Sequence, residues 1–168
     1  MNTALIEQAG TKKLKVNWEK AKSIGLLFDA TQLDKRQTAL KYVDQLRSKK
    51  KKVKVLAYFD AKQHKEASFD FPFFDKSNLD WMNCPKGEQV DFFLSQKFDI
   101  FTFLNPTTSV YSEYIAALSN AHLKIGPISK QLDCYDLMLN VKDKMNLNPF
   151  IQHLEFNLQK TNIEYEAA

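Results

Sequence analysis

Short apolar segments alternate with amphipathic segments of helical length along most of this chain. The segment "SIGLLFDA" at 23–30 is a compact apolar run, typical of a strand that is buried on both faces. The segment "DKRQTALKYVDQLRSK" follows it and places Ala39, Val43 and Leu46 on one face of a helix. Strands that alternate with helices in this way predict a parallel sheet covered by helices on both faces.

The same alternation continues to the end of the sequence. It predicts further strands at 53–60, 98–106, 123–126 and 135–141, and further helices at 87–96, 109–121 and 148–162. Upstream, "LKVNW" at 14–18 alternates apolar and polar residues and predicts an edge strand after a short helix in the weakly patterned segment 1–12. We therefore expect a single α/β domain over residues 1–168, with a three-layer, Rossmann-like fold and a mostly parallel sheet of about five to six strands.

The segment "FDFPFFDKSNLDWMNCPKG" at 69–87 concentrates aromatic side chains between two of the expected elements. Phe69, Phe71 and Phe73 alternate with other residues, which favours an edge strand with one buried face, because proline is tolerated at sheet edges. A second interpretation stays open, in which Trp81 and Cys84 overhang the strand ends and form one wall of a cleft.

No cofactor motif accompanies these fold signals. The four glycines, at positions 10, 25, 87 and 126, cannot supply the G-x-G-x-x-G turn of a dinucleotide site or a P-loop. The three histidines are isolated, and the two cysteines lie fifty positions apart. That spacing indicates neither a zinc site nor a redox dithiol. We expect no cofactor and no metal.

Charge is distributed unevenly along the chain. Residues 1–65 hold 16 Lys or Arg and 6 acids, a net charge of +10, whereas residues 66–168 have a net charge of −6. The densest basic run, "RSKKKKVK" at 47–54, lies where a helix is expected to end, and cations there complement the helix dipole. No aromatic residues interleave with these lysines as stacking platforms, which argues against nucleic-acid binding.

Hydropathy and the N-terminal sequence bear on the compartment. The longest apolar runs are far shorter than the roughly 18 residues of a membrane span, and no basic and apolar leader begins the sequence. We expect a cytoplasmic protein that does not enter a membrane.

The ends of the expected strands supply the candidate binding site, because open α/β sheets bind ligands outside the carboxyl ends of their strands. Asp29 follows the first central strand, Asp60 the second and Asn105 the third. The segment "NPTTS" precedes a helix whose free N–H groups suit a small anion, or its residues simply cap that helix. The candidate ligand-binding residues are Asp29, Asp60, Asn105, Thr107, Thr108, Ser109 and Trp81.

The sequence matches two catalytic motifs only in part. "LLFDAT" resembles the first motif of haloacid-dehalogenase phosphatases, but Ala30 stands where that motif needs a second Asp. Asp29, Asp60 and Lys142 resemble the acid pair and lysine of response-regulator receivers, but Asn105 stands where the phosphoacceptor Asp is expected. No catalytic residue is therefore assigned.

Several segments together carry a resemblance to a known family. "AKSIGLLFDAT", "VLAYFD", "FDIFTFLN" and "SEYIAALSNAHLKIGP" resemble an uncharacterised family of small cytoplasmic α/β proteins from Bacteroidota, over nearly the whole chain from about residue 13. "FDIFTFL" followed by "AALSNAHLKIG" is also similar to the N-terminal half of heptosyltransferase-like GT-B glycosyltransferases, whose second, donor-binding half this sequence lacks.

These observations favour a non-catalytic domain that acts through a protein partner or binds a small anionic ligand at the strand ends. The alternative is a transferase-like or phosphatase-like enzyme that uses Asp29 and the loop 105–109.

Overall fold

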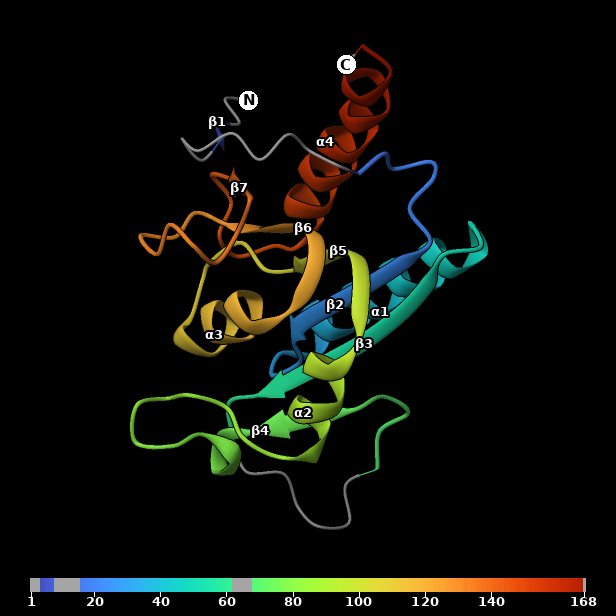
Figure 1. The fold of residues 1–168 in the computed structure, drawn as a ribbon. Helices are drawn as coiled ribbons and strands as arrows, with labels where there is room; N and C mark the ends of the chain where they lie inside the picture. The colour runs from blue at the N-terminus through green and yellow to red at the C-terminus, as the bar shows by residue number, and fades with distance from the viewer. Residues whose placement is uncertain (1–3, 8–15, 62–67, 168) are drawn as a thin grey trace.

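The computed structural model describes residues 4–7, 16–61 and 68–167, which form a seven-stranded sheet between two layers of helices (Figure 1). The strands are β1 (Ala4–Glu7), β2 (Ser23–Asp29), β3 (Lys52–Phe59), β4 (Phe73–Asp75), β5 (Lys97–Phe103), β6 (Asn120–Pro127) and β7 (Leu137–Asn140). Their order across the sheet is β1-β7-β6-β5-β2-β3-β4. Strands β2 to β7 run parallel to one another, and β1 pairs antiparallel with β7. This confirms the expected Rossmann-like class.

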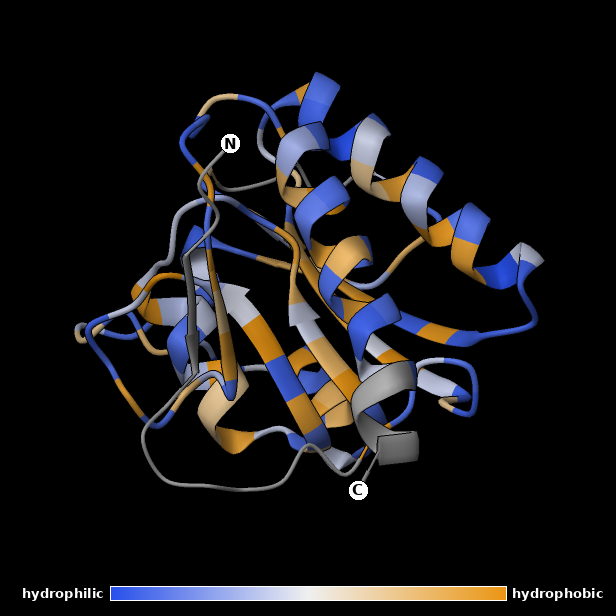
Figure 2. Ribbon diagram, turned by 90° about the horizontal axis from the view of Figure 1, so that it is seen from above, coloured by the Kyte–Doolittle hydropathy of each residue, from blue (hydrophilic) through white to orange (hydrophobic). Residues whose placement is uncertain are grey.

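The helices divide between the two faces of the sheet. Helices α1 (Leu33–Ser48) and α4 (Asn148–Ala167) lie side by side on one face, where the Tyr42 hydroxyl donates a hydrogen bond to Glu155 (Figure 2). Helices α2 (Glu88–Ser95) and α3 (Val110–Leu118) cover the other face, and the 3-10 helix η1 (Lys76–Asn78) follows β4. Figure 2 shows the apolar stretches of the strands between these layers.

Strand β2 forms the centre of the sheet because its side chains are apolar on both faces. Leu26 and Phe28 pack with α1 and α4, whereas Leu27 packs with α2 and α3, and all three are inaccessible to solvent. A strand with polar residues on one face could not occupy this position without burying them. The apolar run at 23–30 thus predicts the place of this strand as well as its existence.

The strand order creates one reversal in the direction of winding. From β2 the chain passes through α1 on one face to β3, and from β5 it passes through α3 on the opposite face to β6. Because β2 and β5 are neighbours, their loops leave toward opposite faces and open a crevice at the carboxyl ends of the strands.

Two expectations for the N-terminal region are wrong where the structure describes it. Residues 4–7 form strand β1 instead of a helix, because the outer edge of β7 offers them backbone partners. Val16, Asn17 and Trp18 of the expected edge strand at 14–18 lie outside any strand, and the Trp18 N–H donates to Thr161 Oγ1 of α4. The other residues of that expected strand, 14 and 15, lie outside the described residues.

The aromatic segment contains a shorter strand than the alternation predicts. Only Phe73–Asp75 pair with β3, as the edge strand β4. Phe69 and Phe71 lie before this strand and stack on Phe59, with ring centroids 4.8 and 6.4 Å from that ring. These rings are partly buried against the core, as the packing interpretation expects.

Within the described residues, no helix combines the length and the apolar character needed to cross a membrane.

Candidate functional site

A shallow hollow of about 400 Å³ lies where β2 and β3 end and α3 begins; we call it the rim hollow. Its lining residues are Asp29, Tyr58, Asp60, Lys76, Leu79, Asn83, Ser109, Val110 and Tyr111. The hollow lies on the α3 side of the crevice that the reversal of winding creates. In folds of this class that crevice is where ligands bind.

Asp29 is the last residue of β2 and has both carboxylate oxygens in hydrogen bonds. Oδ1 accepts from the backbone N–H of Thr31, an Asx turn that carries the chain from β2 toward α1. Oδ2 accepts a long hydrogen bond of 3.4 Å from the Tyr111 hydroxyl, which comes from α3. The carboxylate is half-buried and therefore still partly open to the hollow.

Asp60 directly follows β3 and stands beside Asp29 in the lining. Its Oδ1 accepts a 3.0 Å hydrogen bond from the Tyr58 hydroxyl, and its backbone N–H donates to Thr31 Oγ1 at 2.9 Å. Thr31 thus ties the loops after two neighbouring strands together through its N–H and its hydroxyl. This connection holds the two carboxylates at one end of the sheet.

Tyr58 and Tyr111 form the aromatic floor of the rim hollow, with their ring centroids 4.1 Å apart. Burial, followed by the hydrogen bond to Asp60, raises the pKa of Tyr58 well above its ordinary value. Burial and then the charge of Asp29 raise the pKa of Tyr111. Both phenols therefore stay protonated at neutral pH and donate to the carboxylates.

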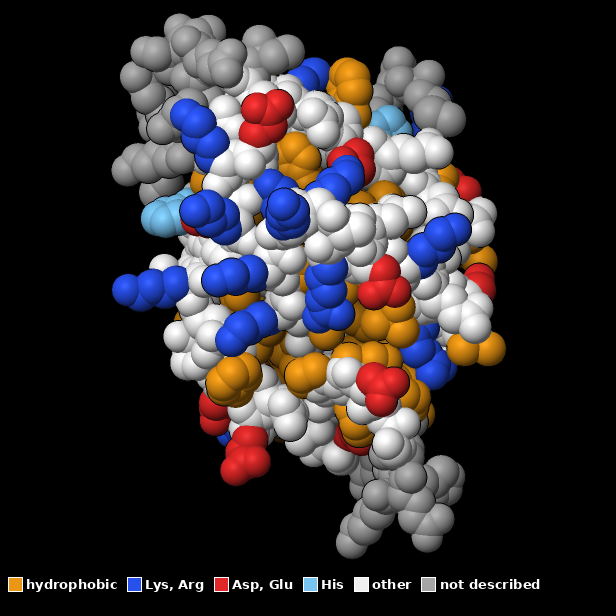
Figure 3. Space-filling view, turned by 90° about the vertical axis from the view of Figure 1, so that its right-hand side faces the viewer, with side chains coloured by type: hydrophobic (Ala, Val, Ile, Leu, Met, Phe, Trp, Pro, Cys, Tyr) orange, Lys and Arg blue, Asp and Glu red, His pale blue; other side chains and the backbone are white. Residues whose placement is uncertain are grey.

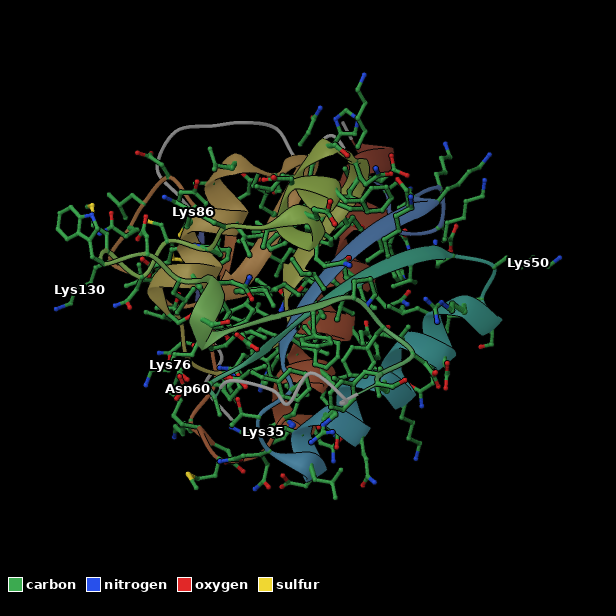
Figure 4. The ribbon with its side chains drawn as sticks, turned by 90° about the horizontal axis from the view of Figure 1, so that it is seen from below. Lys35, Lys50, Asp60, Lys76, Lys86 and Lys130 are labelled. Atoms are coloured by element: carbon green, nitrogen blue, oxygen red, sulfur yellow. The ribbon has the colours of Figure 1, made fainter. Side chains whose placement is uncertain are left out.

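Lys76 supplies the cationic side chain of the lining, from the first residue of η1. Figure 4 shows Lys76 and Asp60 at the same corner of the molecule, with Lys50 at the opposite end. The lining thus combines two carboxylates, one ammonium and two neutral phenols. Its formal charge is negative.

Residues of the segment 105–109 form side-chain hydrogen bonds with one another and with the first turn of α3. Asn105 is buried, and its Nδ2 donates to the carbonyl oxygen of Thr107 at 2.7 Å. Thr108 Oγ1 donates to Glu113 Oε1 at 3.1 Å. Of the predicted residues in this segment, only Ser109 lines the rim hollow.

Ser109 is the N-cap of α3 in a reciprocal capping box with Ser112. The Ser109 hydroxyl accepts from the Ser112 N–H, and the Ser112 hydroxyl accepts from the Ser109 N–H. Glu113 adds a carboxylate to the first turn. The two serine hydroxyls therefore accept from two of the N–H groups at this end of the helix, and the Glu113 carboxylate offsets the positive end of the helix dipole. An anion at this position would compete with these side chains.

Trp81 does not line the rim hollow. It stands at the tip of a turn with 90% of its surface exposed. Asp80 stabilises this turn because its Oδ1 accepts from the backbone N–H groups of Met82 and Cys84 at 2.9 and 3.0 Å. The neighbours Leu79 and Asn83 contribute to the lining instead.

The structure therefore places Asp29, Asp60 and Ser109 of the predicted residues in the lining of the rim hollow, and it leaves Asn105, Thr107, Thr108 and Trp81 outside that lining. Sequence reasoning missed Tyr58, Lys76 and Tyr111. A signal existed for Tyr58, because "YFD" places its side chain on the same side of the chain as Asp60. No comparable signal existed for Tyr111, whose contact with Asp29 joins residues 82 positions apart.

The described part of the chain contains no group of three or more His, Cys, Asp or Glu side chains placed to hold a metal ion.

Comparison with models of protein families gives a match. A model of a protein family covers residues 2–160, and its description is "Family of unknown function (DUF6913)". No curated protein and no solved structure matches the chain.

Proposed function

The chain belongs to DUF6913, a family of unknown function, and we propose that it is a non-catalytic domain that binds a small molecule rich in hydrogen-bond donors in the rim hollow. The observation that carries this proposal is the meeting of Asp29 and Asp60, from two neighbouring strands, with the phenols of Tyr58 and Tyr111 at the crevice of the sheet.

The chemistry of the lining supports a ligand with an ammonium group or several hydroxyl groups. Asp29 and Asp60 carry two negative charges against the single positive charge of Lys76. Carboxylate oxygens accept hydrogen bonds and attract cations, and the tyrosine rings offer apolar surface beside them. An amino sugar or a short aliphatic amine has this combination of charge and surface.

The hydroxyl groups of the lining already form hydrogen bonds within the protein, which supports binding without catalysis. The Ser109 hydroxyl is held by Ser112 as a helix cap, at 3.0 Å, and contacts no general base. The two phenols are donors to carboxylates and keep their protons. Among the described lining residues, no nucleophile therefore stands beside a base.

A small anion at the N-terminus of α3, the ligand expected from the sequence, has less support. The capping box of Ser109 and Ser112 already occupies the N–H groups of these two residues. The two carboxylates of the hollow would repel it.

A thermal-shift experiment tests the proposed function. Glucosamine and putrescine serve as amine probes, and glucose 6-phosphate serves as the anionic probe. A ligand at ten times its dissociation constant stabilises a protein by about 1.4 kcal/mol, which corresponds to about 4 °C in Tm for a chain of this size. We expect such a shift with an amine probe and none with the phosphate.

Amide variants test whether the shift in Tm arises from binding in the rim hollow. Asp29→Asn and Asp60→Asn each remove a charge from the hollow, and the amide introduced at position 29 keeps an oxygen that can still accept from the Thr31 N–H, so the fold is retained. Asp143→Asn is the matched control, since Asp143 likewise accepts from the N–H two residues ahead, at Met145. The proposal fails if neither amine shifts Tm, or if the control abolishes the shift as fully as the two hollow variants do.

The resemblances support two further proposals. We infer that this is a bacterial, cytoplasmic protein. The free thiols of Cys84 and Cys134 support the compartment, because cysteines usually stay reduced in the cytoplasm. The relation to the N-terminal half of GT-B glycosyltransferases also stays a proposal, supported by the segments that carry it and by the Rossmann-like order of the strands.

A further inference from the structure

The first half of β3 has one open edge. Along its whole length β3 pairs with β2 or its flanking residues, but on its other side it pairs with β4 only at Ala57, Tyr58 and Phe59. Within the described residues, the stretch 52–56 has no strand on that side. Backbone groups at such an edge can pair with an added strand.

The direction of these backbone groups follows from the pairing that does exist. The Ala57 N–H points toward β4, because it donates to the carbonyl oxygen of Pro72 at 3.0 Å. Successive residues of a strand direct their N–H and C=O groups alternately to the two sides, so Val53 and Val55 direct theirs to the open side. Arg47 Nη2 confirms this direction, since it donates to the Val53 carbonyl oxygen at 3.1 Å.

Pro72 explains why β4 does not continue along this edge. In the parallel register in which Ala57 faces Phe73, the Val55 carbonyl oxygen would face the backbone nitrogen of residue 72. Proline has no N–H to donate. The chain before Pro72 instead places Phe71 and Phe69 on Phe59, on the α1 side of the sheet.

The open edge forms the floor of a groove of about 250 Å³, which we call the β3-edge groove. Its lining residues are Arg47, Val53, Lys54, Val55, Asp70, Pro72, Gln89, Phe92 and Phe93. The walls are the end of α1, the segment before β4, and α2. Phe92 is the most notable wall residue, because 56% of this large apolar side chain is exposed on α2.

The surroundings of the β3-edge groove are basic. Figure 3 shows Lys and Arg side chains gathered over and around an apolar patch on this side of the molecule. Arg47 and Lys54 belong to the lining, Lys50 and Lys52 lie exposed nearby, and Asp70 is the one carboxylate of the lining. Lys54 also places its ammonium 5.0 Å from the centre of the Phe92 ring and donates to Gln96.

We propose that the β3-edge groove is the docking site of an extended, acidic segment of a partner protein, which adds a strand to the sheet beside residues 52–56. The N–H groups of Val53 and Val55 and the Val55 carbonyl oxygen supply the backbone pairing, while the Val53 carbonyl oxygen stays with Arg47. Phe92 and the valines receive the apolar side chains of that segment, and the basic side chains select its acidic residues.

The same charges disfavour pairing of this edge with the β3 edge of a second copy of the chain. Pairing of two β3 edges would bring Lys52 and Lys54 of one copy against those of the other, and like charges across such a contact repel. The edge is thus protected against self-association while it remains open to a partner of opposite charge.

The test uses a displayed library of random peptides of about ten residues, near the upper length of ordinary strands. Selection on the full chain should enrich peptides in which Asp or Glu alternates with branched or aromatic residues. On binding, the amides of Val53 and Val55 should become protected from hydrogen exchange. Affinity should fall as salt is added, because exposed charges are screened.

Two matched pairs of variants make the test specific. Phe92 and Phe156 are similarly exposed, at 56% and 60%, and each has a lysine ammonium over its ring, from Lys54 and Lys160 respectively. Phe92→Asp and Lys54→Glu should each weaken the selected peptides by about tenfold or more. Phe156→Asp and Lys160→Glu, on α4, should leave the affinity unchanged.

Three results would overturn the proposal: selection of no peptide, selection of peptides without acidic residues, or protection outside residues 52–56. Equal losses in the α2 and α4 variants would also contradict it. The outcome does not depend on the rim hollow, which lies at the other end of β3.

Discussion

At the scale of single residues, two close approaches in the sheet depend on glycine. A Cβ atom at Gly25 would lie 2.5 Å from the Phe98 ring, and one at Gly126 would lie 2.3 Å from the ring of Tyr135. Tyr135 is almost fully buried, and its hydroxyl donates to Ser112 Oγ at 3.1 Å. The ring therefore has no free space into which to move.

Gly126→Ala should lower the free energy of unfolding by about 1 to 3 kcal/mol, because an added methyl group overpacks a core that cannot relax. Urea denaturation measures this loss. In the background of Tyr135→Ala, which removes the ring, the same change at position 126 should cost close to nothing. An equal loss in both backgrounds would show that the ring is not the cause.

At the scale of elements, Asp99 joins the beginnings of two neighbouring strands. This residue of β5 accepts hydrogen bonds through Oδ2 from the N–H groups of Lys22 and Ser23 at 2.7 and 3.0 Å, where β2 begins. Burial acts to raise the pKa of Asp99, but these backbone hydrogen bonds outweigh it and hold the pKa below its ordinary value.

Asp99→Asn should cost about 1 kcal/mol at pH 7, because the ionised carboxylate is the better acceptor. A depressed pKa in the folded state means that this contribution is complete above the ordinary Asp pKa of about 3.9 and disappears as the pH falls through the folded value. Urea denaturation across this range should show the variant and the parent converging in acid. Asp44→Asn, exposed on α1, is the control. A difference that persists unchanged below the folded pKa would contradict the role of the charge.

At the scale of the whole molecule, stability should decrease from the centre of the sheet to its edges. Leu26, Leu27 and Phe28 of β2 are inaccessible to solvent, and β2 is paired on both sides. Strand β4 has three residues and a single neighbour.

Native-state hydrogen exchange should therefore find the slowest amides in β2 and faster exchange in β4, because central strands open only on global unfolding. In β3, the amides of Leu56 and Lys54 face β2 and should exchange more slowly than those of Val53 and Val55. Uniform rates along β3 would mean that its open edge is covered in solution.

Local patterns in the sequence determined the kind and the position of most elements. The apolar run at 23–30 became β2, and the periodic segment at 34–49 became α1, each within about one residue of its expected bounds. Burial on both faces of a strand, or on one face of a helix, depends on the types of neighbouring residues, so it can be predicted without knowledge of the fold. The presence of Asp29 and Asp60 at strand ends followed from the same patterns.

Only the tertiary structure decided which strand ends meet. The strand order places the N-terminus of α3 beside β2, and so Tyr111 reaches Asp29. It also gives residues 4–7 a partner in β7 and, within the described residues, leaves the first half of β3 without a strand on the side away from β2. Helix and strand periodicity is a property of adjacent residues, whereas strand order depends on packing between residues far apart in the chain. For this reason the sequence by itself predicted Asp29, Asp60 and Ser109 of the rim hollow but not its floor or Lys76, and it contained no sign of the β3-edge groove.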